Sequence, residues 1–332
     1  MLVAVPSTFD DRRAVAFAND LPGFEAEPEL VIDFSPLNWV YPFGTLVIAH
    51  AIRQVIIRRR SRGLQTHVQG HQAVAGAVSY LKYFGFFRYI GVNAGLDVNA
   101  APGGSRYLPV TLFNKAGLAQ RQGTRLLQDT LDEDCRRLAQ VIFSKPEECS
   151  AADMLGYCFR ELLRNSFEHA NVSSCAAMAQ RWDNGLAEVV IADHGIGIYR
   201  SLSQVHEVQS EEEALRLALK PGISSGASRA TGGVWDNTGF GLYVVSQLGV
   251  RYGAFSMISS ERVLANPTSL VPLPSIALSG TIVKLRVSTN DAEYWPNILA
   301  NIVKDGEAEA ALIPGAIRSA SGGSKKSNTW GG

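Results

Sequence analysis

The apolar residues among the first hundred positions form two kinds of pattern. Short apolar runs at 30–34 and 64–68 predict buried strands, and a Ser-Pro pair breaks the first run. Apolar residues recur at helical spacing over 43–57 and 73–87, which predicts two helices. Strands that alternate with helices favour a sheet with crossover connections, so we expect an α/β domain over residues 1–100.

The pattern changes in the next part of the chain. Gly, Ala, Pro and Asn are frequent over 96–123, so we expect a connection there, followed by a helix over 124–143. A second helix is expected to begin at Ser150, which together with Asp153 has the spacing of a capping box. We therefore treat 101–149 as a connecting region that contains a helix.

Two later segments have the character of strands. Residues 187–192 are apolar apart from Glu188, and residues 281–287 alternate between apolar and polar side chains. In the second segment the polar positions are Lys284 and Arg286. This alternation is typical of an antiparallel sheet with one face in water, so we expect a half-exposed strand.

Length and composition are consistent with two folded domains. The chain has 332 residues, and at about 150 residues per domain this corresponds to two. Hydrophobic residues make up 46%, which excludes a mainly disordered chain. We expect the second domain over 150–290 and a C-terminal extension over 291–332. The extension ends in a Gly- and Ser-rich stretch, 319–332, which predicts a disordered tail.

Charge and cysteine usage narrow the function classes. The 31 Lys and Arg residues are balanced by 31 Asp and Glu residues, so general nucleic-acid binding is not expected. The four cysteines have no CxxC spacing, which favours reduced thiols. No apolar run approaches the roughly 18 residues of a membrane span, and the first residues lack the pattern of a signal peptide. We therefore expect a cytoplasmic protein without a membrane partner.

The first polar motif lies on the helix expected after Ser150. Glu161, Asn165 and His169 recur every four residues and so share one helical face. A carboxylate beside an amide oxygen suits Mg²⁺, which prefers oxygen ligands and takes the rest from water and phosphates. An ordinary amphipathic helix with a polar side gives the same spacing.

The second motif directly follows the apolar strand at 187–192. It consists of Asp193, Gly195 and Gly197. An Asp at a strand end can accept a hydrogen bond from an amino group deep in a pocket, and the glycines permit a close backbone approach. A simple Asx turn is the alternative interpretation.

The third motif consists of Gly239, Gly241 and Leu242, where a glycine-rich stretch leads into an apolar helical pattern. Backbone N–H groups at a helix N-terminus form an anion site suited to phosphates. The preceding segment, 203–237, contains a capping box from Ser210 to Glu213 and is otherwise rich in Gly and Ser, which predicts a lid.

Taken in this order, and with Gly280-Thr281 opening a later strand, the motifs resemble the GHKL ATP-binding superfamily of gyrase B, MutL, sensor histidine kinases and anti-sigma-factor kinases. The resemblance covers about 150–287. It implies a Bergerat-type α+β sandwich, with a mixed sheet and helices on one face, and ATP and Mg²⁺ as cofactors.

The resemblance also implies a role for each motif residue. Asn165 matches the Mg²⁺ ligand, Glu161 the general base, and Asp193 the acceptor of the adenine amino group. The remaining matches to the nucleotide site are His169, Gly195, Gly197, Gly239, Gly241, Leu242 and Thr281. His194 departs from the residue usual after that Asp. Because a buried acceptor left unpaired costs about 1–3 kcal/mol, we expect ATP to be preferred over GTP.

The N-terminal part resembles the STAS domains of anti-sigma-factor antagonists over about residues 1–92. The resemblance rests on residues 30–57, where a strand ending in Asp leads to a turn that opens a helix. At the position of the phosphorylated serine this chain has Pro42, so the resemblance implies that this regulation is lost. A generic small α/β domain is the alternative.

Three functions share this expected pocket. The first is an ATP-dependent regulatory switch with slow hydrolysis, which Glu161 supports. The second is a serine protein kinase of the anti-sigma type. An autophosphorylating histidine kinase is not expected, since the helix expected before Ser150 contains no acceptor His. The third is a nucleotide-gated binding module without hydrolysis. We expect a protein partner, and a homodimer remains open.

Overall fold

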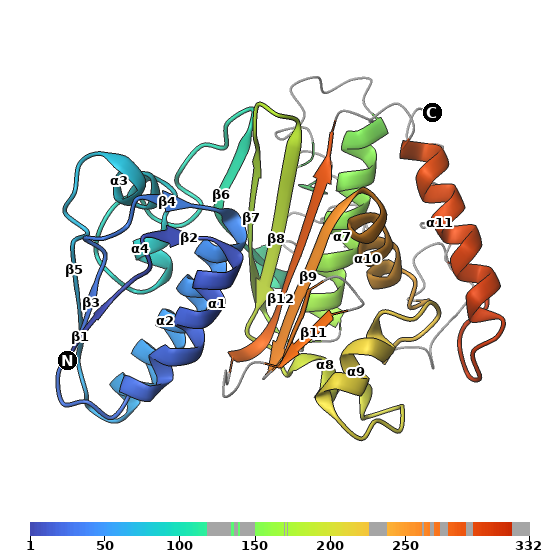
Figure 1. Cartoon of the computed structure of the whole chain (residues 1–332), viewed down its shortest axis with the longest axis horizontal. Helices are drawn as coiled ribbons and strands as arrows, with labels where there is room; N and C mark the ends of the chain where they lie inside the picture. The colour runs from blue at the N-terminus through green and yellow to red at the C-terminus, as the bar shows by residue number, and fades with distance from the viewer. Residues whose placement is uncertain are drawn as a thin grey trace.

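The N-terminal part is built on three short parallel strands in the order β1-β3-β5 (Figure 1). The computed structural model describes residues 1–117, 134–135, 139, 150–168, 170, 172–225, 238–260, 262–265, 269–272, 278–289 and 295–320. The N-terminal strands are β1 (Leu2–Ala4), β3 (Leu30–Asp33) and β5 (Thr66–Gln69), with a separate parallel pair of β2 (Thr8–Phe9) and β4 (Trp39–Val40). The helices are α1 (Asp11–Asp20), the 3₁₀ turn η1 (Leu21–Phe24), α2 (Pro42–Ser61), α3 (Gly76–Tyr83) and α4 (Phe86–Tyr89).

One predicted helix is divided in two. The pattern over 73–87 predicts a single helix, but α3 ends before Gly85, and α4 begins after it. Gly85 has a φ of 77°, a left-handed conformation that interrupts a right-handed helix. The strand expected over 30–34 and the helix expected over 43–57 are confirmed as β3 and α2.

A seven-stranded sheet in the order β11-β10-β9-β12-β8-β7-β6 forms the centre of the molecule. Its strands are β6 (Tyr107–Asn114), β7 (Ser174–Arg181), β8 (Leu186–Asp193), β9 (Gly253–Ser260), β10 (Arg262–Ala265), β11 (Ser269–Pro272) and β12 (Leu278–Ser288). Each of its pairs is antiparallel, so the expectation of a mixed sheet is wrong for this sheet. Strand β6 comes from the region expected to be a connection, and it pairs with β7. The protein is a mixed α/β structure, as expected.

Helices lie on both faces of this sheet (Figure 1). On one face lie α7 (Ser150–Glu168), α10 (Gly241–Tyr252) and α11 (Trp295–Ala310), and near one end lie α8 (Gly197–Leu202) and α9 (Glu211–Ala218). The resemblance implied helices on one face, but α2 packs against β7, β8 and β12 from the other side. Helix α2 can do so because its side chains are buried around most of its circumference.

Several expected elements lie outside the described residues. These are most of the helix over 124–143, residues 226–237 of the expected lid, and the tail from 321 onward. The N-cap that begins α9 is confirmed, since the N–H of Glu213 donates to Ser210 Oγ at 3.1 Å. Glu213 Oε2 accepts the N–H of Gln209 at 2.6 Å, one residue before the N-cap N–H that a capping box uses. Within the described part of the chain, no helix has the length and apolar character that crossing a membrane requires.

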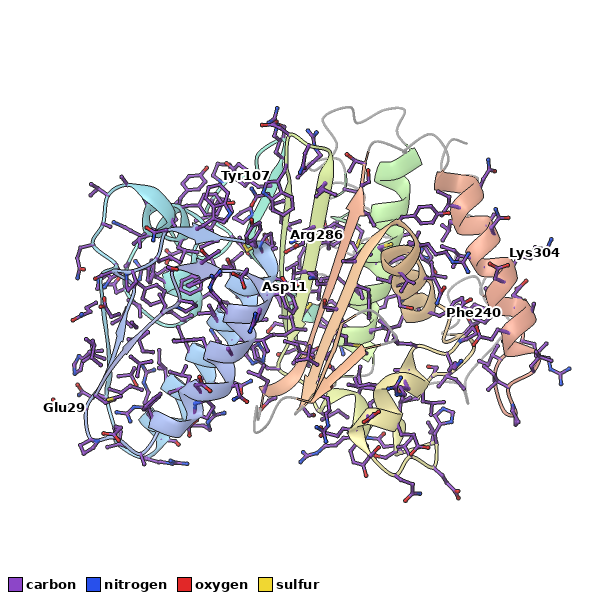
Figure 2. All side chains as sticks on the ribbon, in the orientation of Figure 1. Asp11, Glu29, Tyr107, Phe240, Arg286 and Lys304 are labelled. Carbon is purple, nitrogen blue, oxygen red and sulfur yellow. The ribbon has the colours of Figure 1, made fainter. Side chains whose placement is uncertain are left out.

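On the charged face of β12, Lys284 is buried and Arg286 is half-buried, contrary to the expectation of a face in water. Lys284 is 2% exposed, forms an ion pair with Asp11 of α1, and lies 4.9 Å from the centre of the Phe43 ring. Figure 2 shows Asp11 and Arg286 in the layer between the N-terminal helices and the sheet. The alternation predicts a face in water, whereas α1 supplies Asp11 as a partner for Lys284.

Glu188 of β8 joins the sheet to the start of α2. Its side chain is fully buried, and its Oε1 atom accepts the N–H of Phe43 at 2.9 Å. Its Oε2 atom accepts a hydrogen bond from Arg286 Nε at 2.7 Å. A carboxylate at this position satisfies a free N–H of the first helical turn and interacts favourably with the helix dipole.

We predict that Glu188→Ala lowers the free energy of unfolding by about 3–5 kcal/mol, because it leaves a guanidinium and a helix N–H without their buried partner. Urea denaturation followed by circular dichroism measures the change. The matched control is Glu212→Ala, which removes an exposed pair with Arg216 and should cost less than about 1 kcal/mol. Equal losses in the two variants would contradict the structural role of Glu188.

Candidate functional site

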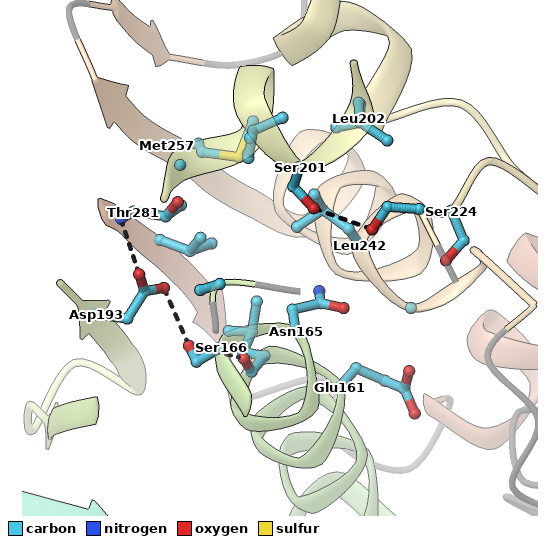
Figure 3. Close-up of a pocket in the computed structure, with 18 of the residues that line it drawn as sticks. Glu161, Asn165, Ser166, Asp193, Ser201, Leu202, Ser224, Leu242, Met257 and Thr281 are labelled. Atoms are coloured by element: carbon cyan, nitrogen blue, oxygen red, sulfur yellow. Dashed lines mark hydrogen bonds between the residues drawn. The ribbon is translucent and has the colours of Figure 1, made fainter. Parts of the chain in front are cut away.

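A pocket lies between α7, the ends of β8 and β12, and helices α8 and α10 (Figure 3). Its space, including solvent at the mouth, totals about 830 Å³. The lining is mixed, and its polar members outside the glycines are Glu161, Asn165, Ser166, Asp193, Ser201, Ser224, Ser225 and Thr281.

Asp193 is the buried acceptor of the pocket. It ends β8 and is 3% exposed. Its Oδ1 atom accepts the N–H of Gly195 at 2.8 Å and the N–H of Thr281 at 3.2 Å, and its Oδ2 atom accepts from Ser166 Oγ at 3.2 Å. Burial raises the pKa of Asp193 to about 6, and these three hydrogen bonds offset part of the effect. The hydrogen bond from the Gly195 N–H to Asp193 forms the Asx turn that the sequence offers as the alternative interpretation. Asp193 makes this turn and also lines the pocket.

Two glycines, Gly239 and Gly241, line the pocket at the start of α10. Gly239 has a φ of 71°, and a Cβ there would lie 2.3 Å from the carbonyl oxygen of Ile223. A Cβ on Gly241 would lie 2.3 Å from Glu161 Oε2. Position 239 therefore needs glycine, whereas a side chain at position 241 would have to displace the Glu161 carboxylate, which lies against the N-terminal end of α10.

Glu161 is held by two arginines of its own helix. Its Oε1 atom accepts hydrogen bonds from Arg160 Nε at 3.1 Å and Nη2 at 2.9 Å, and Arg164 Nη1 lies 3.6 Å away. All three side chains are buried. The arginines thus engage one oxygen, while Oε2 is the atom directed toward Gly241.

Asn165 lies one helical turn after Glu161, and its amide is drawn toward the interior of the pocket (Figure 3). Within the described residues, no group of three or more His, Cys, Asp or Glu side chains could enclose a metal ion. A divalent cation at this site would therefore take part of its coordination from the ligand and from water.

The structure brings most of the predicted residues together. The pocket is lined by Glu161, Asn165, Asp193, Gly197, Gly239, Gly241, Leu242 and Thr281. Gly195 binds the Asp193 carboxylate through its N–H without lining the pocket. His169 lies outside the described residues.

Sequence reasoning missed Ser166 and the apolar lining. Ser166 directly follows Asn165 and donates to Asp193, yet a serine within a helix gives no signal of its own. The apolar wall includes Leu162, Ile191 and Met257, whose pattern in the sequence is the same as that of ordinary core residues.

The pocket thus brings together a buried acceptor, an amide oxygen, a partly engaged carboxylate and a helix N-terminus.

No family model matches the chain, and no match was found among the curated proteins or the solved structures.

We predict that Asp193 makes the protein less stable as the pH rises from about 4 to 6. In this window the unfolded carboxyl, with its ordinary pKa of 3.8, is ionised while the folded one keeps its proton. The unfolded state therefore binds fewer protons, and stability falls by roughly 3 kcal/mol across the window.

Urea unfolding at pH 4 and pH 7 measures this loss in the wild type relative to Asp193→Asn. The comparison with the variant is needed because His50 and His194 act in the opposite direction. Burial lowers their pKa values to about 4 and 3, so their contribution to stability is lost as the pH falls below 6.5. Parallel pH profiles for wild type and variant would refute the assignment to Asp193.

Proposed function

We propose that the pocket binds ATP with Mg²⁺, and that the protein is an ATP-dependent regulatory switch of the GHKL type with slow hydrolysis. One observation carries this proposal: a buried carboxylate acceptor, Asp193, and the glycine-bordered start of α10 border the same pocket. Figure 3 shows Asp193 and Glu161 on opposite sides of Ser166 and Asn165. An elongated ligand with an amine at one end and negative charge at the other fits this polarity.

The Asp193 end suits adenine. An ionised carboxylate has about four acceptor sites, and three of those on Asp193 are used by Gly195, Thr281 and Ser166. The remaining site can accept the exocyclic amine of adenine, whereas guanine would bring a carbonyl oxygen to the same position. The apolar side chains of Ile191 and Met257 line the same pocket and can contact the faces of a base.

The opposite end suits phosphates. Helix α10 has 12 residues, no side chain among the described residues caps its N-terminus, and its first residue, Gly241, lines the pocket. The N–H groups of the first turn and the positive end of the helix dipole favour anions there. The Asn165 oxygen is a ligand of the type that Mg²⁺ prefers, so these residues fit a metal held jointly with phosphate oxygens and water. Bound Mg²⁺ would neutralise phosphate charge.

Glu161 supports slow hydrolysis. Its Oε2 atom can accept a proton from a water and so orient that water toward a phosphorus atom, while Arg160 holds Oε1. The same ion pair favours a second candidate, a nucleotide-gated binding module without hydrolysis, because a carboxylate engaged by guanidinium groups is less available to water.

We predict that Asp193→Asn weakens ATP binding by about 10–100-fold, which corresponds to the loss of a hydrogen bond to a charged group. Isothermal titration calorimetry with Mg-ATP measures the effect, and GTP should bind weakly to the wild type. The control is Asp183→Asn, since the Asp183 side chain is 84% exposed on a turn. In the same titrations, Asn165→Ala should reduce the dependence of ATP affinity on Mg²⁺. Unchanged ATP affinity in Asp193→Asn would remove the adenine assignment.

We further predict that Glu161→Gln abolishes release of labelled phosphate from γ-labelled Mg-ATP while ATP affinity changes little. The amide is close in shape to the carboxylate but cannot take a proton from water. Release that persists in the variant contradicts the general-base role. Wild-type protein that binds ATP and leaves it intact would favour the non-hydrolysing module.

A further inference from the structure

His194 connects the pocket to the opposite face of the sheet. Successive side chains of a strand point to opposite faces, so the residue after Asp193 is directed toward the N-terminal helices. The His194 ring stacks on the ring of His50 from α2, with centroids 3.8 Å apart and planes inclined by 8°. Its Nε2 atom lies 3.2 Å from the hydroxyl oxygen of Tyr89.

Helix α2 also holds the chain segment before Thr281. His50 Nε2 donates to the carbonyl oxygen of Ser279 at 2.7 Å. The Gln54 amide binds both backbone groups of the same residue: its Nε2 donates to the Ser279 oxygen at 3.2 Å, and its Oε1 accepts the Ser279 N–H at 3.3 Å. Two residues later, the N–H of Thr281 donates to Asp193.

The segment between these contacts has little freedom to move. A Cβ on Gly280 would lie 1.9 Å from the carbonyl oxygen of Asp193, so the two backbones are already in close contact. His50 is fully buried, and its Nδ1 atom has no hydrogen-bond partner in the described part of the chain. The single ring proton of a neutral His50 therefore belongs on Nε2, where it binds Ser279.

We propose that α2 of the N-terminal part belongs to the nucleotide site, with His50 and Gln54 as positioning residues. His50 contacts His194, the residue after Asp193, through ring stacking. His50 and Gln54 together hold Ser279, two residues before Thr281, whose N–H binds the Asp193 carboxylate. The ligand named here, ATP, rests on the function proposed above. Because coupling between two binding events is reciprocal, ATP binding and docking of α2 stabilise each other. Nucleotide occupancy is thereby linked to the N-terminal part of the same chain.

The test uses the full chain and variants of similar volume. The double variant His50→Phe with Gln54→Leu removes the three side-chain bonds to Ser279 and keeps an aromatic ring beside His194. His50→Gln retains an N–H donor and serves as the conservative rescue. Val55→Ala is the matched control, since Val55 is a fully buried residue of α2 outside this network.

Two measurements follow for each protein: ATP affinity by calorimetry, and hydrogen exchange by mass spectrometry in peptides that contain 193–197 and 278–282. We expect the double variant to bind ATP about tenfold more weakly and to exchange faster at the N–H groups of Gly195 and Thr281. His50→Gln should recover most of the affinity. Val55→Ala should lower global stability and leave both readouts near the wild-type values.

The outcomes separate this inference from the proposed function. Unchanged affinity and exchange in the double variant, or equal changes in Val55→Ala, would overturn the positioning role. If the wild type does not bind ATP, the proposed function fails, and the exchange at Gly195 and Thr281 alone decides whether α2 positions Asp193.

Discussion

Burial of the seven-stranded sheet on both faces is the constraint on which the rest of the structure depends. Helix α2 lies between this sheet and the three-stranded one, so its apolar side chains are covered on both sides. The same packing takes charged groups out of water, and each needs a partner because an unpaired buried charge is costly. Lys284 forms an ion pair with Asp11, and Glu188 accepts hydrogen bonds from Arg286 and from the first turn of α2.

The strands therefore divide their side chains between two environments. In β8, Ile191 packs in the core on the α7 side, while Val190 and Ala192 pack in the core on the α2 side. The pocket and the N-terminal packing thus share one backbone, and a displacement of that backbone changes both. The positioning role proposed for His50, which does not line the pocket, would act through this shared backbone.

The sequence predicted the pocket better than its surroundings. Asp193 ends the apolar strand β8, and Gly241 begins the apolar helix α10. Their local positions therefore depend on short-range patterns that the sequence shows directly. The burial of Lys284 was not readable, because alternation shows only which residues share a face and not what covers that face. Strand β6 was missed for a related reason: its pairing with β7 depends on partners 60–73 positions away rather than on local propensity.

The bond between Phe43 and Glu188 joins residues 145 positions apart, and this separation has a consequence for folding during synthesis. At about 5–20 residues per second, the ribosome needs roughly 7–30 s to produce the acceptor after the donor. During that time α2 is covered by α1 and the three-stranded sheet, and the side that will meet β8 and β12 has no sheet to pack on. A newly made chain therefore carries an uncovered apolar helix face until β8 and β12 have been synthesised.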